Sequence, residues 1–312
     1  MSAGLLLVQS LNGLQLGVLL FLIAAGLTIV FGVMDVVNLA HGVQYMLGAY
    51  LAVAFAAWSG SFWVAVPLAA AASYVLGAVL ERLVFRHLLG ASHLDQVLAT
   101  FGLILLAEEG VRLLCGPAPL SLAMPELLAG TLPLPGGLRY PLYRLAVLAA
   151  GLLVGVLLWL LIEHTRAGMR LRAGASNAAM LSALGVNVGK LFARLLALGA
   201  MLAGFAGALA APLVSVEPGM GGPVLILAFV VIVLGGAGSV RGAFLAALLV
   251  GLTDTLGRSV LDAALHAGLG AAAAATAGPA LASMLIYAVM AVVLAFRPQG
   301  LLPAAPAERG GG

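Results

Sequence analysis

The chain has 312 residues, of which 63% are hydrophobic and 8% are charged, with a formal net charge of +3. A water-soluble domain of this composition would expose most of its apolar surface, so the composition excludes that class and indicates an integral membrane protein. Short segments that alternate between apolar and polar residues, as a membrane barrel requires, are absent. We therefore expect an all-α polytopic membrane protein with about eight to ten transmembrane helices in one domain, residues 1–312.

Apolar runs with few acidic or basic residues mark the expected spans along the chain. A helix needs about 20 apolar residues to cross the bilayer, so the longest runs must hold more than one crossing. In chain order, the expected spans are residues 8–33, 41–58, 62–81, 96–115, 143–163, 191–213, 223–236, 242–257 and 279–296. The first is read as a retained helix rather than a cleaved signal. The tract "GLGAAAAATAG", residues 268–278, is expected to be a structural spacer in the last external connection.

Positive charge is concentrated in one connection, the segment 164–190 with the residues that follow it. Five of the fourteen Lys and Arg residues flank or lie in it: Arg166, Arg170, Arg172, Lys190 and Arg194. By the positive-inside rule this connection is cytoplasmic. Counting crossings outward from it places the Pro-rich segment 116–142 outside, as an external loop. Within 191–213, small residues recur at Gly199, Ala203 and Gly207, a spacing that allows close helix packing.

The stretch "GVMDVVNLAHGVQYMLGAY", residues 32–50, places Asp35, Asn38 and His41 between two strongly apolar runs. Asn38 is a competent N-cap for the following helix, and Gly42 permits close approach of a backbone or a ligand. A helix N-terminus that opens into a membrane cavity suits a carboxylate. The alternative interpretation, a tight turn capped by polar residues, remains open.

A second Gly-rich break, "VLGGAGSVRGA" at residues 233–243, also separates two apolar spans. Two interrupted hydrophobic pairs, one in each half of a chain, point to a transport pathway. The residues that we assign to a substrate pathway are Asn38, His41, Gly42, Gln44, Tyr45, Gly235, Gly236 and Gly238.

The cytoplasmic segment carries its own helical pattern. Met180, Leu181 and Leu184 fall at helical spacing, and Gly185 can end that helix. The pattern predicts a short amphipathic helix at the cytoplasmic face. An ordinary basic loop that enforces topology is the alternative.

Catalytic and metal-binding signatures are absent from the sequence. It contains no H-E-x-x-H and no G-x-S-x-G motif, and Cys115 is its only cysteine. "GVNVGKL", residues 185–191, has too few residues between its glycines for a phosphate loop and lacks the Ser or Thr that would hold magnesium. We expect a non-enzymatic chain that binds no cofactor or metal itself, so any ATP dependence would come from another chain.

Three stretches carry a family resemblance: "NGLQLGVLLFLIAAGLTIVFGVMDVVNLAHGVQYMLGAY", "RAGMRLRAGASNAAMLSALGVNV" and "VLGGAGSVRGA". In this order and spacing they resemble permease subunits of branched-chain amino-acid ABC transporters, of the type with Asn-x-Ala-His-Gly. The resemblance implies a multi-pass permease in a bacterial inner membrane that forms the translocation pathway with a second permease. It further implies a periplasmic substrate-binding protein and two ATPase subunits that bind ATP and Mg.

The resemblance also implies that residues 164–190 dock on an ATPase. The residues assigned to this coupling are Arg170, Arg172, Asn177, Leu181, Leu184 and Gly185. The family commonly has charged residues where this chain reads "NAAMLSAL", so docking is expected to use shape and flanking arginines. The function expected is ATP-driven import of branched-chain or related amino acids. The alternative is a stand-alone secondary transporter or channel for a small solute, and similar permeases serve urea and short amides.

Overall fold

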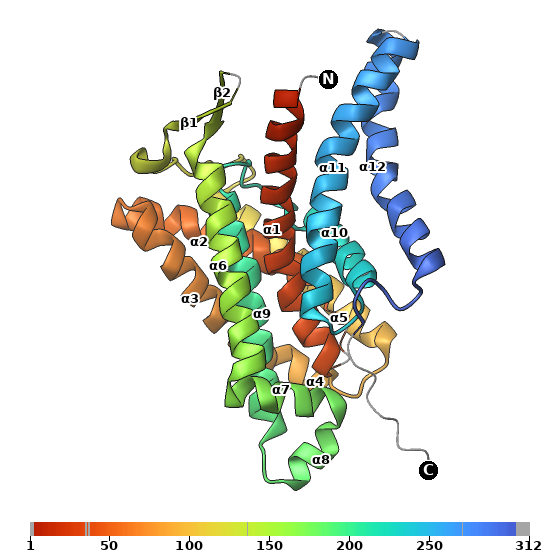
Figure 1. Ribbon diagram of the computed structural model, residues 1–312. Helices are drawn as coiled ribbons and strands as arrows, with labels where there is room; N and C mark the ends of the chain where they lie inside the picture. Colours follow the sequence, from red (N-terminus) through yellow and green to blue (C-terminus); the bar gives the residue numbers. More distant parts are fainter. Residues whose placement is uncertain (1–2, 35, 37, 136, 270, 304–312) are drawn as a thin grey trace.

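The computed structural model describes residues 3–34, 36, 38–135, 137–269 and 271–303, and it is almost entirely helical (Figure 1). Its elements in chain order are α1 (Ala3–Met34), α2 (His41–Ser59), α3 (Phe62–Leu80), the π-helix η1 (Glu81–Phe85), α4 (Arg86–Leu88), α5 (His93–Cys115), the 3₁₀ turn η2 (Glu126–Leu128), β1 (Thr131–Leu134), β2 (Leu138–Pro141), α6 (Leu142–His164), α7 (Arg166–Ser176), α8 (Ala178–Ala183), α9 (Val188–Ala210), α10 (Gly221–Gly235), α11 (Val240–Leu269) and α12 (Ala271–Phe296).

Within the described residues, 5 helical segments are long and apolar enough to cross a membrane: Gly4–Met34, Phe62–Leu88, Leu142–His164, Val188–Ala210 and Val240–His266. Gly221–Gly235 and Ala280–Phe296 are shorter apolar helices. A helix satisfies its own backbone hydrogen bonds in lipid, so these segments fit the expected helical membrane class. The expected number of crossings stays a prediction.

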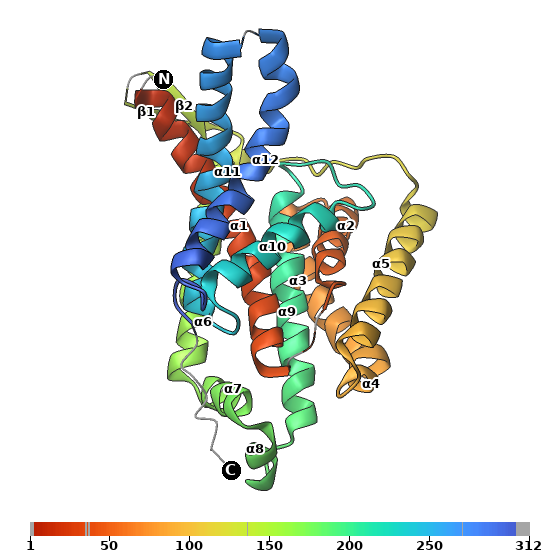
Figure 2. The same ribbon diagram turned by 90° about the vertical axis from the view of Figure 1, so that its right-hand side faces the viewer.

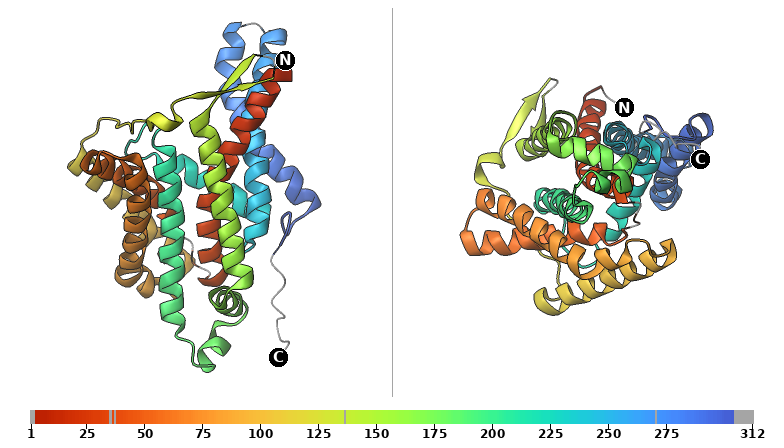
Figure 3. Two further views of the ribbon diagram at one scale, coloured as in Figure 1. Left: turned by 60° about the vertical axis from the view of Figure 1, so that its left-hand side comes forward. Right: turned by 90° about the horizontal axis from the view of Figure 1, so that it is seen from below.

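Helix α1 forms the centre of the molecule, with α2 and α3 on one side and α11 and α12 on the other (Figure 3). It packs against α11, α9, α6 and α10. Of the most apolar window of α1, 78% is buried, against 17% for α6. The uniformly apolar α1 is thus a core helix, whereas α6 keeps much of its surface for lipid or another subunit.

Two outer segments depart from the expected loops. The segment 116–142 contains an antiparallel hairpin in which β1 pairs with β2, Leu132 opposite Tyr140. Helices α11 and α12 extend beyond the expected spans and form a hairpin at the upper end, opposite α7 and α8 (Figure 2). The tract 268–278 therefore contributes to two helix ends, and its residue 270 lies outside the described residues.

Small residues let α9 approach two other helices, as the sequence predicted. A Cβ added at Gly199 would lie 3.1 Å from the Gly26 carbonyl oxygen of α1, and one at Gly207 would overlap the Tyr45 carbonyl of α2. Ala203 between them is fully buried. The small side chains therefore allow backbone contact with α1 at one level and with α2 at the next.

We expect the α2–α9 contact to be sensitive to one methyl group. A Cβ at Gly48 of α2 would overlap the Gly204 backbone, whereas a Cβ at Gly102 of α5 meets no atom within 4 Å. Gly48→Ala should lower the free energy of unfolding by about 1–3 kcal/mol, the usual cost of overpacking. The control Gly102→Ala should be neutral or stabilising, because alanine is the better helix former. Thermal unfolding in detergent measures both, and equal midpoints would contradict the contact.

Candidate functional site

Helix α2 begins well within the length of α1 rather than beside its end. At 1.5 Å per residue, Asn12 and Met34 of α1 lie about 33 Å apart, close to the hydrocarbon thickness of a bilayer. Ile23 lies halfway between them in sequence, and its carbonyl oxygen accepts a hydrogen bond of 3.0 Å from His41 Nε2. His41 is the first residue of α2. The chain therefore turns back after α1 and starts α2 about 16 Å before the end of α1.

The imidazole of His41 reaches the α1 backbone because Gly26 has no side chain. A Cβ at Gly26 would lie 3.1 Å from His41 Cε1 and 2.8 Å from the Gly199 carbonyl oxygen of α9. His41 is 1% exposed, and because a carbonyl can only accept, the bond to Ile23 places a proton on Nε2. His41 thus joins the start of α2 to α1, beside the point where α1 meets α9.

The N-termini of α2 and α10 meet at Gly42 and Gly221. Gly42 is the second residue of α2, and Gly221 is the first residue of α10. A Cβ at Gly42 would lie 2.5 Å from the Gly221 carbonyl oxygen and 2.9 Å from Leu225 Cβ. Each helix N-terminus carries a partial positive charge and unpaired N–H groups. Two such ends side by side favour an anionic group such as a carboxylate.

Buried polar side chains near this junction lack hydrogen-bond partners. Asn38 is 0% exposed and both its amide atoms are unpartnered, as is Thr28 Oγ1 of α1. The Gln44 amide lies beside the His41 ring, also without a well-formed bond. Unsatisfied buried polar groups are costly, so this cluster favours water or a polar ligand at the start of α2.

The predicted capping role of Asn38 is wrong. The N-cap position of α2 is Ala40, and no side chain caps the helix. Asn38 contributes its backbone carbonyl, which accepts from the His41 N–H at 3.4 Å, because a turn of two further residues separates it from α2. Asp35, the third polar residue of the break, lies outside the described residues.

A cavity of about 370 Å³ lies on the outer side of this junction, and we call it the outer cavity. Leu16, Leu20 and Ile23 of α1 and Leu227 of α10 line its apolar part, and Tyr45 of α2 also faces it. Its opposite end is polar, with the side chains of Asn12, Gln15, Arg144 and Thr255. Of the predicted pathway residues, Tyr45 lines this cavity, whereas the polar end was missed. In the sequence, the signal for this polar end was the presence of two amide residues, Asn12 and Gln15, inside an apolar run.

Of the glycines in the second break, Gly235 and Gly236 pack against neighbouring backbone, whereas Gly238 lines a cavity. Gly235 lies against Gly242, and Gly236 has a φ of +99° and packs against Gln299 and Pro303. The N–H groups of Leu301 and Leu302 donate to the carbonyls of Leu234 and Gly235. Gly235 and Gly236 therefore hold the segment that follows α12 against the end of α10.

Gly238 lines a second, larger cavity of about 1140 Å³, which we call the inner cavity. It lies between α1, α6, α7 and α11, and Thr28 and Gly32 contribute to it from α1. At 100° per residue these positions are centred about 120° around α1 from Leu16 and Leu20 of the outer cavity, so the two cavities use different faces of the helix. Val156 of α6, which is 52% exposed, also lines it, so this cavity opens sideways between α6 and α11.

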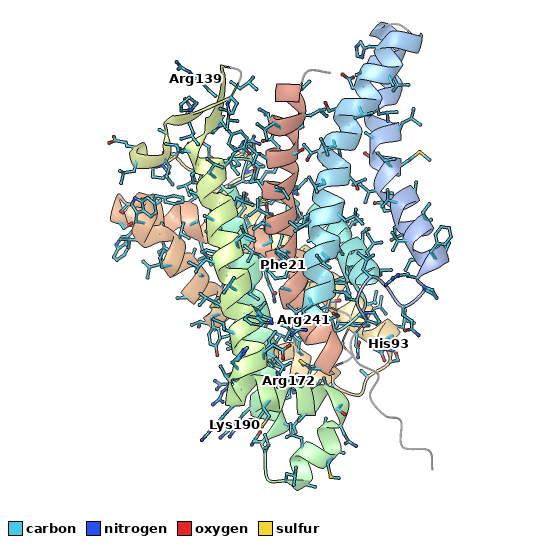
Figure 4. The ribbon with its side chains drawn as sticks, viewed as in Figure 1. Phe21, His93, Arg139, Arg172, Lys190 and Arg241 are labelled. Atoms are coloured by element: carbon cyan, nitrogen blue, oxygen red, sulfur yellow. The ribbon has the colours of Figure 1, made fainter. Side chains whose placement is uncertain are left out.

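An ionic cluster closes the lower end of the inner cavity (Figure 4). Glu163 of α6 pairs with Arg241 of α11 at 2.8 Å and with Arg172 of α7 at 3.6 Å. Arg172 also donates to the Ile162 carbonyl. Arg172 thus ties α7 to the ends of α6 and α11.

The segment 164–190 folds into two short helices, α7 and α8, where the sequence predicted an amphipathic helix. Asn177 ends α7 and caps α8, because its Oδ1 accepts from the Met180 N–H at 2.8 Å. Gly185 follows α8 with a φ of +82°, which confirms its predicted role as a helix end. Leu181 is 6% exposed and packs near Gly174, whereas Leu184 is 75% exposed. Met180 is also exposed, at 61%.

No group of three or more His, Cys, Asp or Glu side chains that could hold a metal ion occurs in the part of the chain that the structure describes. Glu81 of η1 is 2% exposed, and its carboxylate lies 3.9 Å from the guanidinium of Arg86 in α4. This pair lies at the end of α3, away from the junction of α2 with α10.

Comparison with known proteins identifies the family of the chain. The model of the family described as "Branched-chain amino acid transport system / permease component" matches residues 9–294. The high-affinity branched-chain amino acid transport system permease protein BraD of Pseudomonas aeruginosa is 31% identical over 308 residues, which cover 94% of this chain and 94% of the relative.

More distant relatives bear the same description. The permease protein LivH of Escherichia coli K12 is 28% identical, covering 81% of this chain and 86% of the relative. A probable LivH permease of Methanocaldococcus jannaschii is 25% identical, covering 76% of each chain. No solved structure matches the chain. With the family model spanning nearly its whole length, the chain belongs to the permease component family of branched-chain amino acid transport systems.

Proposed function

We propose that this chain is the permease subunit of an ATP-driven importer that carries branched-chain amino acids across a bacterial inner membrane. The observation that carries the proposal is the meeting of two helix N-termini, at Gly42 and Gly221, in the membrane interior below the outer cavity. Such a site stabilises a carboxylate, which every amino acid presents. The relatives' printed descriptions support the same substrate class.

The pathway residues have distinct roles in this proposal. Asn38 and Gln44 offer unpartnered amide groups to the passing zwitterion, and Tyr45 faces it from the outer cavity. His41 positions the start of α2 through its bond to Ile23. Gly42 keeps the two helix ends in contact. Gly235, Gly236 and Gly238 act at the inner end, where they anchor the segment after α12 and line the inner cavity.

In this proposal, other subunits hydrolyse ATP and deliver the amino acid to the permease. A periplasmic binding protein delivers the amino acid, a second permease completes the pathway, and two ATPase subunits bind ATP and Mg. The coupling segment is 164–190, where Met180 and Leu184 present apolar side chains to an ATPase. Leu181, being buried, positions α8 against α7. Arg172 transmits the motion of α7 to α6 and α11 through Glu163.

Reconstitution tests the proposal. The chain, its partner permease and the ATPases are placed in liposomes with the binding protein outside and ATP inside. We expect uptake of radiolabelled leucine, isoleucine and valine that stops without ATP or without the binding protein, and no uptake of urea or acetamide. Ion-gradient-driven uptake by the chain alone would overturn the proposal in favour of a secondary transporter.

A further inference from the structure

The polar end of the outer cavity is built around Arg144, in the first turn of α6. Arg144 Nη1 donates to Asn12 Oδ1 at 2.7 Å and lies 3.5 Å from Gln15 Oε1, both on α1. The Tyr140 hydroxyl donates to the same Asn12 oxygen at 3.1 Å. The neighbouring Tyr143 donates to the Leu209 carbonyl of α9 at 2.7 Å. Both ends of this turn are thereby fixed, and the guanidinium is held in place over the cavity.

The charge of Arg144 is not compensated by the protein. No acidic side chain among the described residues forms an ion pair with it, whereas Arg86, Arg112, Arg172, Arg241 and Arg258 all have carboxylate partners. Burial raises the pKa of the Tyr140 phenol, against the opposing effect of Arg144, so this neighbour stays neutral.

The helix itself also disfavours a lone cation at this position. Arg144 lies at the N-terminal end of α6, whose first turn holds no acidic residue. The partial positive charge of a helix N-terminus repels a cation and attracts an anion. A part-buried guanidinium at such a site has free N–H donors in a geometry that matches a carboxylate.

The rest of the outer cavity is apolar. Leu16, Leu20, Ile23 and Leu227 line it between Arg144 and the junction of α2 with α10. Its volume of about 370 Å³ lies at the small end of the range for ligand pockets. Gln15 Oε1 and Thr255 Oγ1, at the polar end, retain lone pairs that can accept from an ammonium group.

We propose that the outer cavity is a binding site for an amino acid with an apolar side chain, in which Arg144 binds the carboxylate and the leucines and Ile23 contact the side chain. This inference rests on the proposed import function and adds an entry site that begins beside the Gly42–Gly221 junction and extends toward Asn12 and Arg144. The substrate passes from one carboxylate site to the next. Asn12 and Tyr140 are positioning residues, because they hold Arg144 and not the ligand.

Equilibrium binding to the assembled permease–ATPase complex in nanodiscs, without the binding protein, tests the site. The ligands are radiolabelled leucine and, as competitor, leucinamide, which lacks the carboxylate. We expect leucine to bind and leucinamide to compete at least tenfold less well than unlabelled leucine. Arg144→Gln should weaken leucine binding about 10- to 100-fold and remove the discrimination between the two, as expected for loss of a charge-assisted pair.

Arg139→Gln is the matched control, because Arg139 is an exposed arginine of β2, the strand directly before α6, and its side chain lies outside the cavity (Figure 4). It should bind leucine as the parent does. Arg144→Lys keeps the charge and should bind leucine with an affinity between those of the parent and Arg144→Gln. That result would show that the weaker binding of Arg144→Gln comes from the lost charge and not from misfolding. Thermal unfolding checks that all variants fold.

The outcomes separate the two proposals. A parent complex that takes up no amino acid contradicts the import function itself. A parent complex that takes up leucine but binds none without the binding protein, or whose Arg144→Gln variant binds leucine equally well, overturns the outer site alone.

Discussion

Replacing Gly221 with alanine is expected to reduce ATP-driven leucine uptake at least tenfold. A Cβ at this position would overlap the Gly42 carbonyl, so the N-termini of α2 and α10 must separate. Overpacking of this kind costs about 1–3 kcal/mol, and a displacement of about 1 Å is enough to disturb a site built from backbone N–H groups. Uptake by the reconstituted complex, normalised to the amount of assembled complex, measures the loss.

The next residue supplies the control. A Cβ at Gly222 meets no atom within 4 Å, and Gly222 lies in the same turn of α10. Gly222→Ala should therefore take up leucine as the parent does, although the change in helix propensity is the same. Gly42→Leu, on the other side of the contact, should reproduce the loss. Parent-level uptake by both Gly221→Ala and Gly42→Leu would show that the junction is a mere turn.

The break between α1 and α2 shows what the sequence could and could not reveal. Apolar runs and the polar cluster at Asn38 and His41 indicated that the chain reverses there, because polar side chains are costly in lipid. The depth of the reversal was not predictable. It depends on the bond from His41 to Ile23, 18 residues earlier, and on the missing side chain at Gly26. Both features arise from the tertiary structure, and neither leaves a periodic pattern in the sequence.

Local patterns also could not distinguish which residues of a helix face solvent. Met180, Leu181 and Leu184 share one helical arc, and the two leucines looked equivalent as docking residues. Only the fold of α7 over α8 buries Leu181 and leaves the other two exposed. The same holds for Arg144, whose lack of an acidic partner becomes visible only when β2, α1 and α6 come together.

Helix boundaries were predicted best where charge and glycine mark them. Gly185 ends α8, and the basic segment that holds α7 and α8 lies at one end of the molecule (Figure 2). The hairpin of β1 and β2 was missed because its Pro-rich sequence reads as a loop. Its stability comes from Tyr140, which packs and bonds against α1 rather than within the hairpin.

Leu184→Asp is expected to uncouple the ATPases from transport. Leu184 and Met180 are the exposed apolar side chains of the segment around α8 that the proposed function assigns to docking. A buried apolar anchor at a protein interface contributes about 2 kcal/mol or more, so a carboxylate at this position should weaken ATPase binding roughly 30-fold. Affinity of the ATPase subunits for the permease pair in nanodiscs measures this directly, and leucine uptake should fall in parallel while membrane insertion is unchanged.

Two variants of neighbouring residues separate docking from folding. Leu184→Met keeps an apolar side chain and should retain ATPase binding and uptake. Leu181→Asp places a charge in the buried contact between α7 and α8, so it should destabilise the segment itself and lower the thermal midpoint, which Leu184→Asp should not. If Leu184→Asp binds the ATPases with parent affinity and supports parent uptake, docking does not involve α8. The ionic link from Arg172 through Glu163 to Arg241 would then be the remaining route by which α7 could move α6 and α11.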